Sequence, residues 1–232
     1  MFRFKQFEIV DELSAMKIGT DGVLIGAWAD VEEACTILDV GTGTGLCAIM
    51  CAQRNDLAAV HGVDIMEDAV VEARGNAARS PWGNRITMEC ADIRSYDPDV
   101  RYDHIVSNPP YFLETLQSPD MARATARHAT TLTYEDLIAA AERLLMPEGR
   151  LSVVLPTECA RLFRSVAFER LWLSRILDVS TREGDAPKRT LMEFVLTSTP
   201  IMPRSANIAI QRRDGSYTEE YMRLTEEFYL NF

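Results

Sequence analysis

The stretch that decides the fold reads Thr36-Ile37-Leu38-Asp39-Val40-Gly41-Thr42-Gly43-Thr44-Gly45-Leu46-Cys47-Ala48-Ile49-Met50-Cys51-Ala52. Its apolar, β-branched first part predicts a buried strand, and residues 46–52 predict the start of a helix. Three glycines separate the two. Because glycine has no Cβ, the turn can bring backbone N–H groups close to a ligand, and the helix beyond it adds positive dipole. The stretch therefore predicts a strand, turn and helix that bind a nucleotide-like ligand.

Further apolar runs alternate with helix-compatible sequence along the chain. They predict buried strands at 36–40, 59–64, 85–90, 104–107 and 150–155, which form a doubly wound parallel sheet. The last two expected strands, 171–181 and 191–199, are joined by only nine residues that include Gly184 and Pro187. Such a link fits an antiparallel hairpin, because a parallel crossover needs about a dozen residues or more. An α/β fold with a seven-stranded, mostly parallel sheet and an antiparallel terminal hairpin resembles the class I methyltransferase (Rossmann-like) fold.

The sequence on either side of this core also carries patterns. Residues 2–17 alternate loosely between apolar and polar and predict a small hairpin, and residues 22–30 predict a helix. Near the other end, Thr218 is expected to cap a final helix that carries Tyr221, Leu224 and Phe228 on one side. We expect one domain over 1–232, in which a hairpin and helix (1–34) precede the core (35–232).

Composition restricts the classes of function. A hydrophobic content of 47% in 232 residues is enough for a substantial core, and no run approaches the roughly 18 apolar residues of a membrane span, so a cytoplasmic protein is expected. The net charge of −11 opposes broad nucleic-acid binding, so a nucleic-acid substrate would have to meet a confined basic patch. The cysteines are odd in number and form no CxxC pair, which predicts reduced, buried thiols and no metal site: Cys35, Cys47, Cys51, Cys90 and Cys159.

Acidic residues lie at or just after the carboxyl ends of the expected strands, which is the edge where α/β folds bind ligands. Asp64 ends the second strand, where a carboxylate accepts hydrogen bonds from both hydroxyls of a ribose; its alternative role is to cap the helix that begins near Glu67. Asp39 is a candidate partner for a positively charged amino group. Asp92 is a candidate acceptor for an adenine amino group, although Asp also begins loops for local reasons. No arginine follows Asp64 closely to bind the phosphates of a dinucleotide.

The run Ser107-Asn108-Pro109-Pro110-Tyr111 ends the fourth expected strand. The prolines fix φ and remove two N–H donors, so the loop is rigid and its carbonyls are free to accept. The side-chain oxygen of Asn108 and the carbonyl of Pro109 can then receive two hydrogen bonds from one NH₂ group. Both bonds favour a pyramidal nitrogen whose lone pair points at an electrophile. Tyr111 offers a face on which a flipped-out purine can stack.

The glycine turn and the Asn-Pro-Pro-Tyr run support one chemistry together more strongly than either does alone. They indicate transfer of a methyl group from S-adenosylmethionine to an amide or amino nitrogen, with Gly41, Gly43 and Gly45 at the cofactor and Asn108 between cofactor and acceptor. No strong base is needed, because positioning and electrostatics carry most of the effect.

Two further runs carry a family resemblance over most of the chain: Phe4-Lys5-Gln6-Phe7 and Met16-Lys17-Ile18-Gly19-Thr20-Asp21-Gly22-Val23-Leu24-Ile25-Gly26-Ala27-Trp28. With the glycine turn and the Asn-Pro-Pro-Tyr-Phe run, the chain resembles the bacterial adenine-N6 methyltransferases that modify the adenosine beside the anticodon of a valine tRNA. The resemblance implies that Lys17, Thr20 and Asp21 border the methionine end of the cofactor. It further implies that the glycine turn, Asp64 and Asp92 hold the rest, and that the Asn108 loop holds the adenine.

The expected RNA surface is confined to two segments. Residues 112–131 lack glycine and carry Phe112, Arg123, Arg127 and His128 beside Tyr111, and long segments next to a site are often functional. Lys188 and Arg189 form a second basic spot in the late hairpin. His61 and His104 lie within expected strands and are interpreted as packed core residues.

Alternatives from other classes remain. An Asn-Pro-Pro-Tyr loop serves a carboxamide equally well, so a protein glutamine methyltransferase acting on release factors is possible, but the 35 residues before the first expected strand leave no room for the helical domain usual in those enzymes. A DNA adenine methyltransferase would need a further domain to read sequence. A nucleoside-binding or RNA-binding module without catalysis would not need Asn108 and Tyr111. The leading interpretation is a methyltransferase with a valine-type tRNA as partner, without a membrane or a protein partner.

Overall fold

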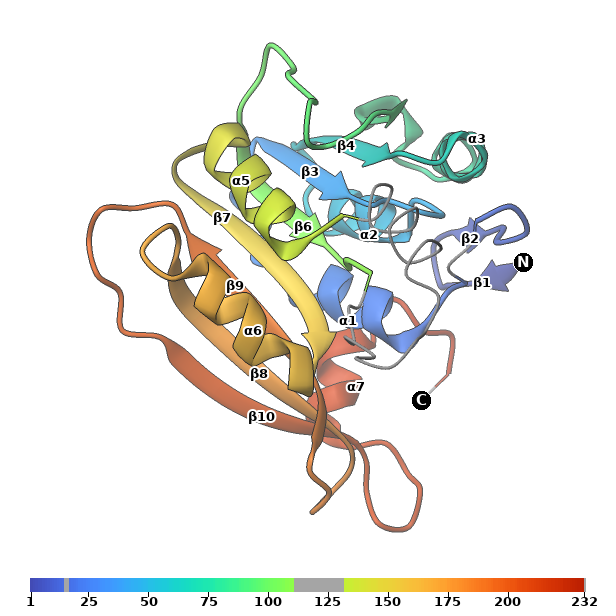
Figure 1. The fold of residues 1–232 in the computed structure, drawn as a ribbon. Coiled ribbons are helices and arrows are strands. Elements are labelled where there is room, and N and C mark those ends of the chain that lie inside the picture. The colour runs from blue at the N-terminus through green and yellow to red at the C-terminus, as the bar shows by residue number, and fades with distance from the viewer. Residues whose placement is uncertain (15–16, 111–131, 232) are drawn as a thin grey trace, which may run out of the picture.

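The computed structural model describes residues 1–14, 17–110 and 132–231. Its centre is a sheet of eight strands in the order β10-β8-β9-β7-β6-β3-β4-β5 (Figure 1). The strands are β3 (Thr36–Val40), β4 (Ala59–Asp64), β5 (Ile86–Cys90), β6 (Tyr102–Ser107), β7 (Leu145–Pro156), β8 (Trp172–Arg182), β9 (Pro187–Val195) and β10 (Arg204–Gln211).

The connections between these strands explain their directions. β3, β4, β5, β6 and β7 are parallel neighbours, whereas β9 lies antiparallel between β7 and β8. Only four residues, 183–186, join β8 to β9, which is too short for a crossover. The predicted fold, a mostly parallel sheet with an antiparallel hairpin at the end, is confirmed.

The predicted number of strands was wrong by one. The eighth strand, β10, pairs parallel with β8 at the edge of the sheet. Its first four residues, 204–207, are exposed, and only its second half contributes partly buried side chains such as Ile208 and Ile210. A half-exposed edge strand has a weak apolar pattern, which is why the sequence did not reveal it.

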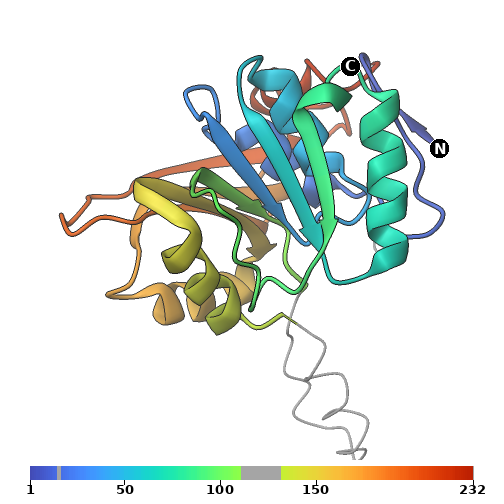
Figure 2. The ribbon, with the colours of Figure 1, turned by 90° about the horizontal axis from the view of Figure 1, so that it is seen from above.

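Helices cover both faces of the sheet (Figure 2). On one face α1 (Thr20–Trp28), α2 (Leu46–Arg54), α3 (Glu67–Arg79) and α7 (Glu219–Thr225) share one apolar cluster, and on the other α5 (Tyr134–Leu144) and α6 (Thr157–Ala167) share a second. A short 3₁₀ turn, η1 (Gly83–Arg85), leads into β5. Two helical layers around the sheet explain why its central strands are apolar on both sides.

The N-terminal hairpin predicted from the sequence is present as β1 (Phe2–Arg3) paired antiparallel with β2 (Glu8–Ile9). Phe4 and Phe7 stack between the two strands and are buried in the main core. The helix expected at 22–30 begins and ends two residues earlier, as α1.

The predicted final helix is α7. The Thr218 hydroxyl oxygen accepts the Tyr221 N–H at 3.3 Å and caps the helix, and Phe228 beyond it is buried. Each capping bond of this kind stabilises a helix by about 1 kcal/mol.

The cysteine and histidine predictions hold in part. Cys47, Cys51 and Cys159 are buried free thiols, but Cys35 and Cys90 are exposed, because one precedes β3 and the other ends the edge strand β5. His104 is fully buried and hydrogen-bonded to Ser152, as expected of a core residue, whereas His61 is only half-buried against Tyr102. Within residues 1–14, 17–110 and 132–231, every helix is too short or too polar to cross a bilayer.

Candidate active site

The site lies where the carboxyl ends of the parallel strands meet. Val40 is in register with Val63 on one side and with Ser107 on the other, so the residues that follow, Gly41, Asp64 and Asn108, become neighbours. A cavity of about 470 Å³ opens between them, a volume within the range of small-ligand sites. Most of the cofactor residues expected from the sequence line this cavity: Lys17, Thr20, Asp21, Gly41, Gly43, Asp64, Asp92 and Asn108.

The glycine turn requires its glycines for different reasons. Gly41, Gly43 and Gly45 have φ values of +71°, +54° and +82°, in the left-handed region that side chains disfavour. A Cβ on Gly45 would lie 3.1 Å from the Met88 methyl carbon and 3.3 Å from the Ala73 Cβ, whereas one on Gly41 would meet nothing within 4 Å. Gly45 therefore lets the turn pack on α3 and β5, while Gly41 faces the open cavity.

Four backbone N–H groups of this turn, those of Gly41, Thr42, Gly43 and Gly45, have internal partners. Gly41 and Thr42 both donate to the Val63 carbonyl, at 2.9 and 3.0 Å, and Gly45 donates to the Thr42 carbonyl at 2.8 Å. The sequence predicted N–H groups turned toward a ligand. In the structure the donors of Gly41, Thr42 and Gly45 hold the shape of the turn, and the backbone of the turn borders the cavity.

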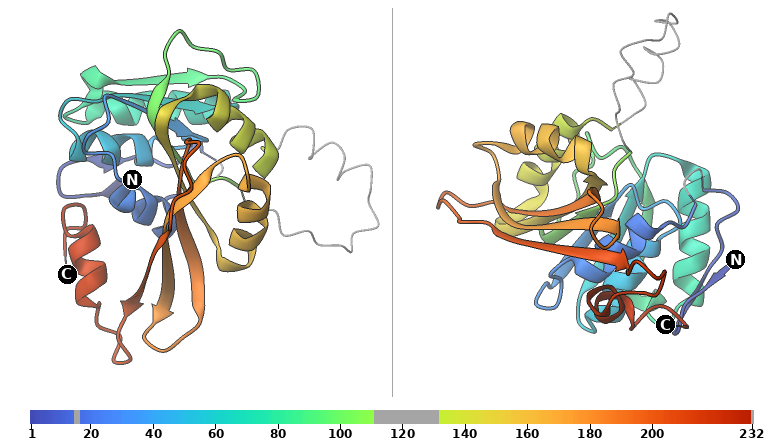
Figure 3. Two further views of the ribbon diagram at one scale, coloured as in Figure 1. Left: turned by 90° about the vertical axis from the view of Figure 1, so that its left-hand side faces the viewer. Right: turned by 90° about the horizontal axis from the view of Figure 1, so that it is seen from below.

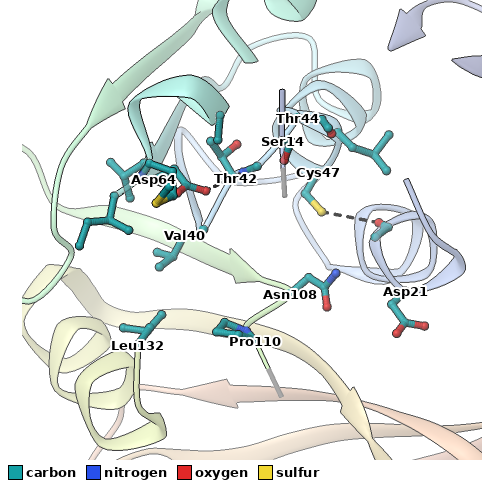
Figure 4. Close-up of a pocket in the computed structure, with 18 of the residues that line it drawn as sticks. Ser14, Asp21, Val40, Thr42, Thr44, Cys47, Asp64, Asn108, Pro110 and Leu132 are labelled. Atoms are coloured by element: carbon teal, nitrogen blue, oxygen red, sulfur yellow. Dashed lines mark hydrogen bonds between the residues drawn. The ribbon is translucent and has the colours of Figure 1, made fainter. Parts of the chain in front are cut away.

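Asp64 combines the two roles weighed from the sequence. Its Oδ2 accepts the Gly43 N–H at 3.0 Å and its Oδ1 accepts the Met66 N–H, also at 3.0 Å, at the residue that caps α3. The side chain also lines the cavity (Figure 4). An ionised carboxylate has about four acceptor positions, so two remain for a ligand's hydroxyl groups.

Asp39 lies beneath the turn and does not line the cavity. Its carboxylate is 1% exposed, and its Oδ2 accepts from the Thr42 hydroxyl at 2.6 Å and from the Ala48 N–H at 3.1 Å. The predicted contact with an amino group of the ligand is therefore not available to it. Asp39 instead ties the turn to the first turn of α2, which positions the cavity wall.

Burial raises the pKa of Asp39 to about 6 from its ordinary value of 3.8. A carboxyl whose pKa is higher in the folded state binds its proton more tightly there, so the free energy of unfolding falls as the pH rises from about 4 to 6. Asp39→Asn keeps an oxygen for both bonds but does not titrate. We expect the unfolding free energy of the variant, relative to that of wild type, to increase by about 3 kcal/mol from pH 4 to pH 7. Urea unfolding at both pH values measures this, with Asp56→Asn at an exposed site as the control. Parallel pH profiles for the Asp39 variant and wild type would contradict it.

Asp92 also lines the cavity, and it has a partner that sequence reasoning missed. Arg94 Nε lies 2.9 Å from each carboxylate oxygen of Asp92, and its Nη2 lies 2.5 Å from Oδ2. These hydrogen bonds are the main reason that the pKa of Asp92 is lowered. Both residues line the cavity, so a carboxylate and a guanidinium lie side by side on its wall. The sequence signal that could have revealed this pair was a basic residue two positions after an acidic one.

Arg189 is not part of an outer basic spot. Its guanidinium Nε bonds to the Asp21 carboxylate at the start of α1, and both side chains line the cavity. The neighbouring Lys188 is exposed. Residues that alternate along a strand point to opposite sides, which separates this pair: Arg189 belongs to the cofactor cavity, and Lys188 faces solvent.

A strap of residues 10–14 crosses toward the glycine turn and is held by α3. The buried carboxylate of Glu72 accepts the N–H groups of Glu12, Leu13 and Ser14 at 2.6, 2.7 and 3.0 Å. The Asn76 amide donates to the carbonyls of Val10 and Thr44, at 2.8 Å each. Sequence reasoning missed both residues, because a Glu and an Asn in a helix usually face water.

Lys17 is hydrogen-bonded to this strap and lines the cavity. Its ammonium bonds to the carbonyls of Asp11 and Glu12, and Thr20 follows at the start of α1. The segment predicted to border the methionine end of a cofactor therefore lies at the cavity. Its position depends on the Glu72 anchor.

Asn108 stands at the end of β6, between the glycine turn and Asp21 (Figure 4). The Ser107 hydroxyl donates to the Val40 carbonyl at 2.8 Å and fastens this strand end to β3. Pro109 is buried behind it, and Pro110 lines the cavity. The other residues predicted to meet an acceptor or RNA lie outside the described residues: Tyr111, Phe112, Arg123, Arg127 and His128.

These residues fit S-adenosylmethionine. The cavity offers Asp64 for ribose hydroxyls, Asp92 for an adenine amino group, and an apolar lining of Ile65, Met66 and Ile93. In the described part of the chain, His, Cys, Asp and Glu side chains form no group of three that could hold a metal ion. The arrangement can hold a nucleoside next to an amide acceptor, as group transfer to a nitrogen requires.

The chain is similar to known methyltransferases. Residues 18–161 match the methyltransferase small domain. Solved structures with a related fold include a predicted O-methyltransferase of Agrobacterium tumefaciens (TM-score 0.70, 21% identity, 90% of this chain and 96% of that one). Another is the N-methyltransferase NodS of Bradyrhizobium japonicum in complex with S-adenosyl-L-homocysteine (TM-score 0.53, 18% identity, 75% and 83%).

Curated relatives are closer in sequence. Proteins named tRNA1(Val) (adenine(37)-N6)-methyltransferase from Bacteroides fragilis and Phocaeicola vulgatus are 45% and 46% identical, and each alignment covers 99% of this chain and 97% of the relative. The protein of that name from Serratia proteamaculans is 41% identical over 99% of this chain and 89% of its own length. At this identity over nearly the whole length, the chain belongs to the tRNA1(Val) (adenine(37)-N6)-methyltransferase family.

Proposed function

We propose that this protein transfers a methyl group from S-adenosylmethionine to N6 of adenosine 37, next to the anticodon of a valine tRNA, as a single-domain cytoplasmic enzyme. The observation that carries the proposal is the place of Asn108, which lines the same cavity as Asp64 and the glycine turn. An amide acceptor at that point suits an amino nitrogen. The names of relatives 41–46% identical to this chain support the tRNA and the adenine.

The cofactor residues act by holding and orienting. Asp64 accepts from the ribose, and Asp92, fixed by Arg94, accepts from the adenine amino group. Thr20 and Asp21 border the methionine end, and Lys17 also lines the cavity. When bound, S-adenosylmethionine supplies an electrophilic methyl group on a positively charged sulfur.

The acceptor residues aim the nitrogen. The Asn108 side-chain oxygen and the Pro109 carbonyl each accept a hydrogen bond from the N6 amine, which directs the nitrogen lone pair toward the cofactor. Asn108 carries no charge, so it acts by position and polarity and not as a strong base. Tyr111 and Phe112, which follow in sequence, are proposed to stack on the target base.

Mass spectrometry of tRNA tests this function. Valine tRNA from a strain lacking the gene is incubated with the protein and S-adenosylmethionine, digested and analysed. We expect new N6-methyladenosine in the fragment that contains position 37. The matched control is the Asn108→Ala protein, and release factor is the competing substrate. Methylated glutamine in release factor, with no methylated adenosine in tRNA, would contradict the proposal.

A further inference from the structure

Two turns extend from the edge of the sheet that carries the active site. The β8–β9 hairpin turns at residues 182–187, and the chain turns again after β10 at residues 211–217. Because β8 and β10 run parallel to each other and in the same direction as β7 and β6, both turns lie beyond the carboxyl ends of the strands. Figures 1 and 3 show them side by side, in orange and red, at the lower end of the molecule.

The two turns are in contact. The Glu183 N–H donates to the Gln211 carbonyl at 2.9 Å, and Arg182 is in register with Gln211. The Arg213 guanidinium lies over Gly184 so closely that a Cβ there would be 2.5 Å from its Nη2, and Gly184 has a φ of +84°. Glycine at this position therefore lets the second turn place Arg213 on the first. We refer to residues 182–188 and 211–217 together as the paired turns.

Their charge differs from that of the rest of the chain. The paired turns carry four basic and three acidic side chains, whereas the whole chain has a net charge of −11. Asp214 accepts from the Ser216 N–H and hydroxyl at 2.9 and 2.6 Å, which occupies one of its oxygens within the turn. Arg212 pairs with Glu219 at 3.3 Å. Arg182, Lys188 and Arg213 are exposed and form no ion pair with any described acidic residue.

The second turn also carries an aromatic ring, which lies 5.5 Å from the ring of Tyr221. Tyr217 closes the second turn through a bridge to Gln211 and is 41% exposed. The paired turns are linked to the cavity through the chain, because Arg189, the residue after Lys188, lines the cavity. Exposed cations beside an aromatic ring are the combination that holds nucleic-acid backbone and bases.

We propose that the paired turns are a docking surface for the RNA backbone, in which Arg182, Lys188 and Arg213 contact phosphates of the substrate tRNA next to the nucleotide held at Asn108. This proposal rests on the proposed function and adds where the substrate is held. It also explains how an acidic protein binds RNA: attraction is concentrated at one place on the active-site edge, and the remaining surface repels phosphate.

Charge reversal tests the surface. The variant Arg182→Glu with Arg213→Glu is compared with Arg101→Glu with Arg204→Glu, which makes the same change in charge at exposed residues at the opposite ends of β6 and β10. Binding of a fluorescently labelled valine tRNA is measured by anisotropy over a range of salt concentrations. Calorimetry measures S-adenosylmethionine binding, and thermal melting checks the fold.

We expect the paired-turn variant to bind tRNA roughly tenfold or more weakly. The slope of log K against log salt should become shallower by about 1.4–1.8 for two lost phosphate contacts. Cofactor affinity and kcat at saturating tRNA should stay at the wild-type level, while KM for tRNA rises. The control variant should keep most of the wild-type affinity.

A neutral pair, Arg182→Gln with Arg213→Gln, removes the same two contacts, so it should flatten the slope by a similar amount while it weakens the affinity less. It covers the case in which charge reversal unfolds the turns. Wild-type affinity and salt slope in the neutral pair would overturn the docking surface while leaving the methylation of tRNA intact. A wild-type protein that methylates release factor and not tRNA would overturn the proposed function, and the docking surface with it.

Discussion

We expect Asn108→Ala to lower the rate of methyl transfer about 10²–10³-fold, by analogy with the removal of one aimed polar group from other active sites. The side chain lines the cavity at the end of β6, and in the proposed mechanism its oxygen accepts a hydrogen bond from the acceptor amine and makes little contact with the cofactor. The affinity for S-adenosylmethionine should therefore stay close to that of wild type. Single-turnover assays with valine tRNA measure the rate, and calorimetry measures the affinity.

The matched control for this variant is Asn207→Ala, the same change at an exposed position of β10. Its rate should equal that of wild type. If Asn108→Ala methylates tRNA at nearly the wild-type rate, the hydrogen-bond mechanism at the acceptor amine is wrong.

Asp64→Ala should weaken cofactor binding by about 1.5–3 kcal/mol for each charge-assisted hydrogen bond lost to the ribose. The structure adds a second cause, because the same carboxylate accepts the Gly43 N–H in the turn and the Met66 N–H at the start of α3. Without it the turn loses the partner that holds it against the cavity. Calorimetric titration with S-adenosylmethionine measures the loss.

Two variants accompany Asp64→Ala. Asp64→Asn keeps the side-chain shape and one oxygen and should lose less affinity, and Asp56→Ala removes an exposed acid outside the cavity and should lose none. Unchanged affinity in Asp64→Ala would refute its assignment to the ribose.

Much of the fold was predictable because its signals are local. The run from Thr36 to Ala52 contains strand, turn and helix in sequence, and the nine residues between the last two expected strands were too few for a crossover. The edge strand β10 was not predictable in this way. Its position comes from pairing with β8, while half of its side chains remain in water.

For the candidate site, the sequence likewise predicted the place of some residues and not the direction of others. Asp64 is the last residue of β4, and Gly41 and Asn108 directly follow β3 and β6. The rule that ligands bind at the carboxyl ends of parallel strands was therefore enough to bring them together. Asp39 satisfies the same rule, but its side chain points beneath the turn. The positions of strand ends predict which residues lie close together, whereas the direction of one side chain depends on the groups that pack around it.

By itself, the sequence determined the fold class, the glycine turn and the place of Asn108 at a strand end, because each depends on residues adjacent in the chain whose backbone preferences are intrinsic. Only the tertiary structure decided the partners of charged groups. Arg189 meets Asp21 across 168 positions, Glu72 holds a strap 58–60 residues away, and Arg213 lies on Gly184. These contacts form because folding brings a charged side chain close to a group far away in the sequence. The geometry that selects the partner is not contained in the local sequence.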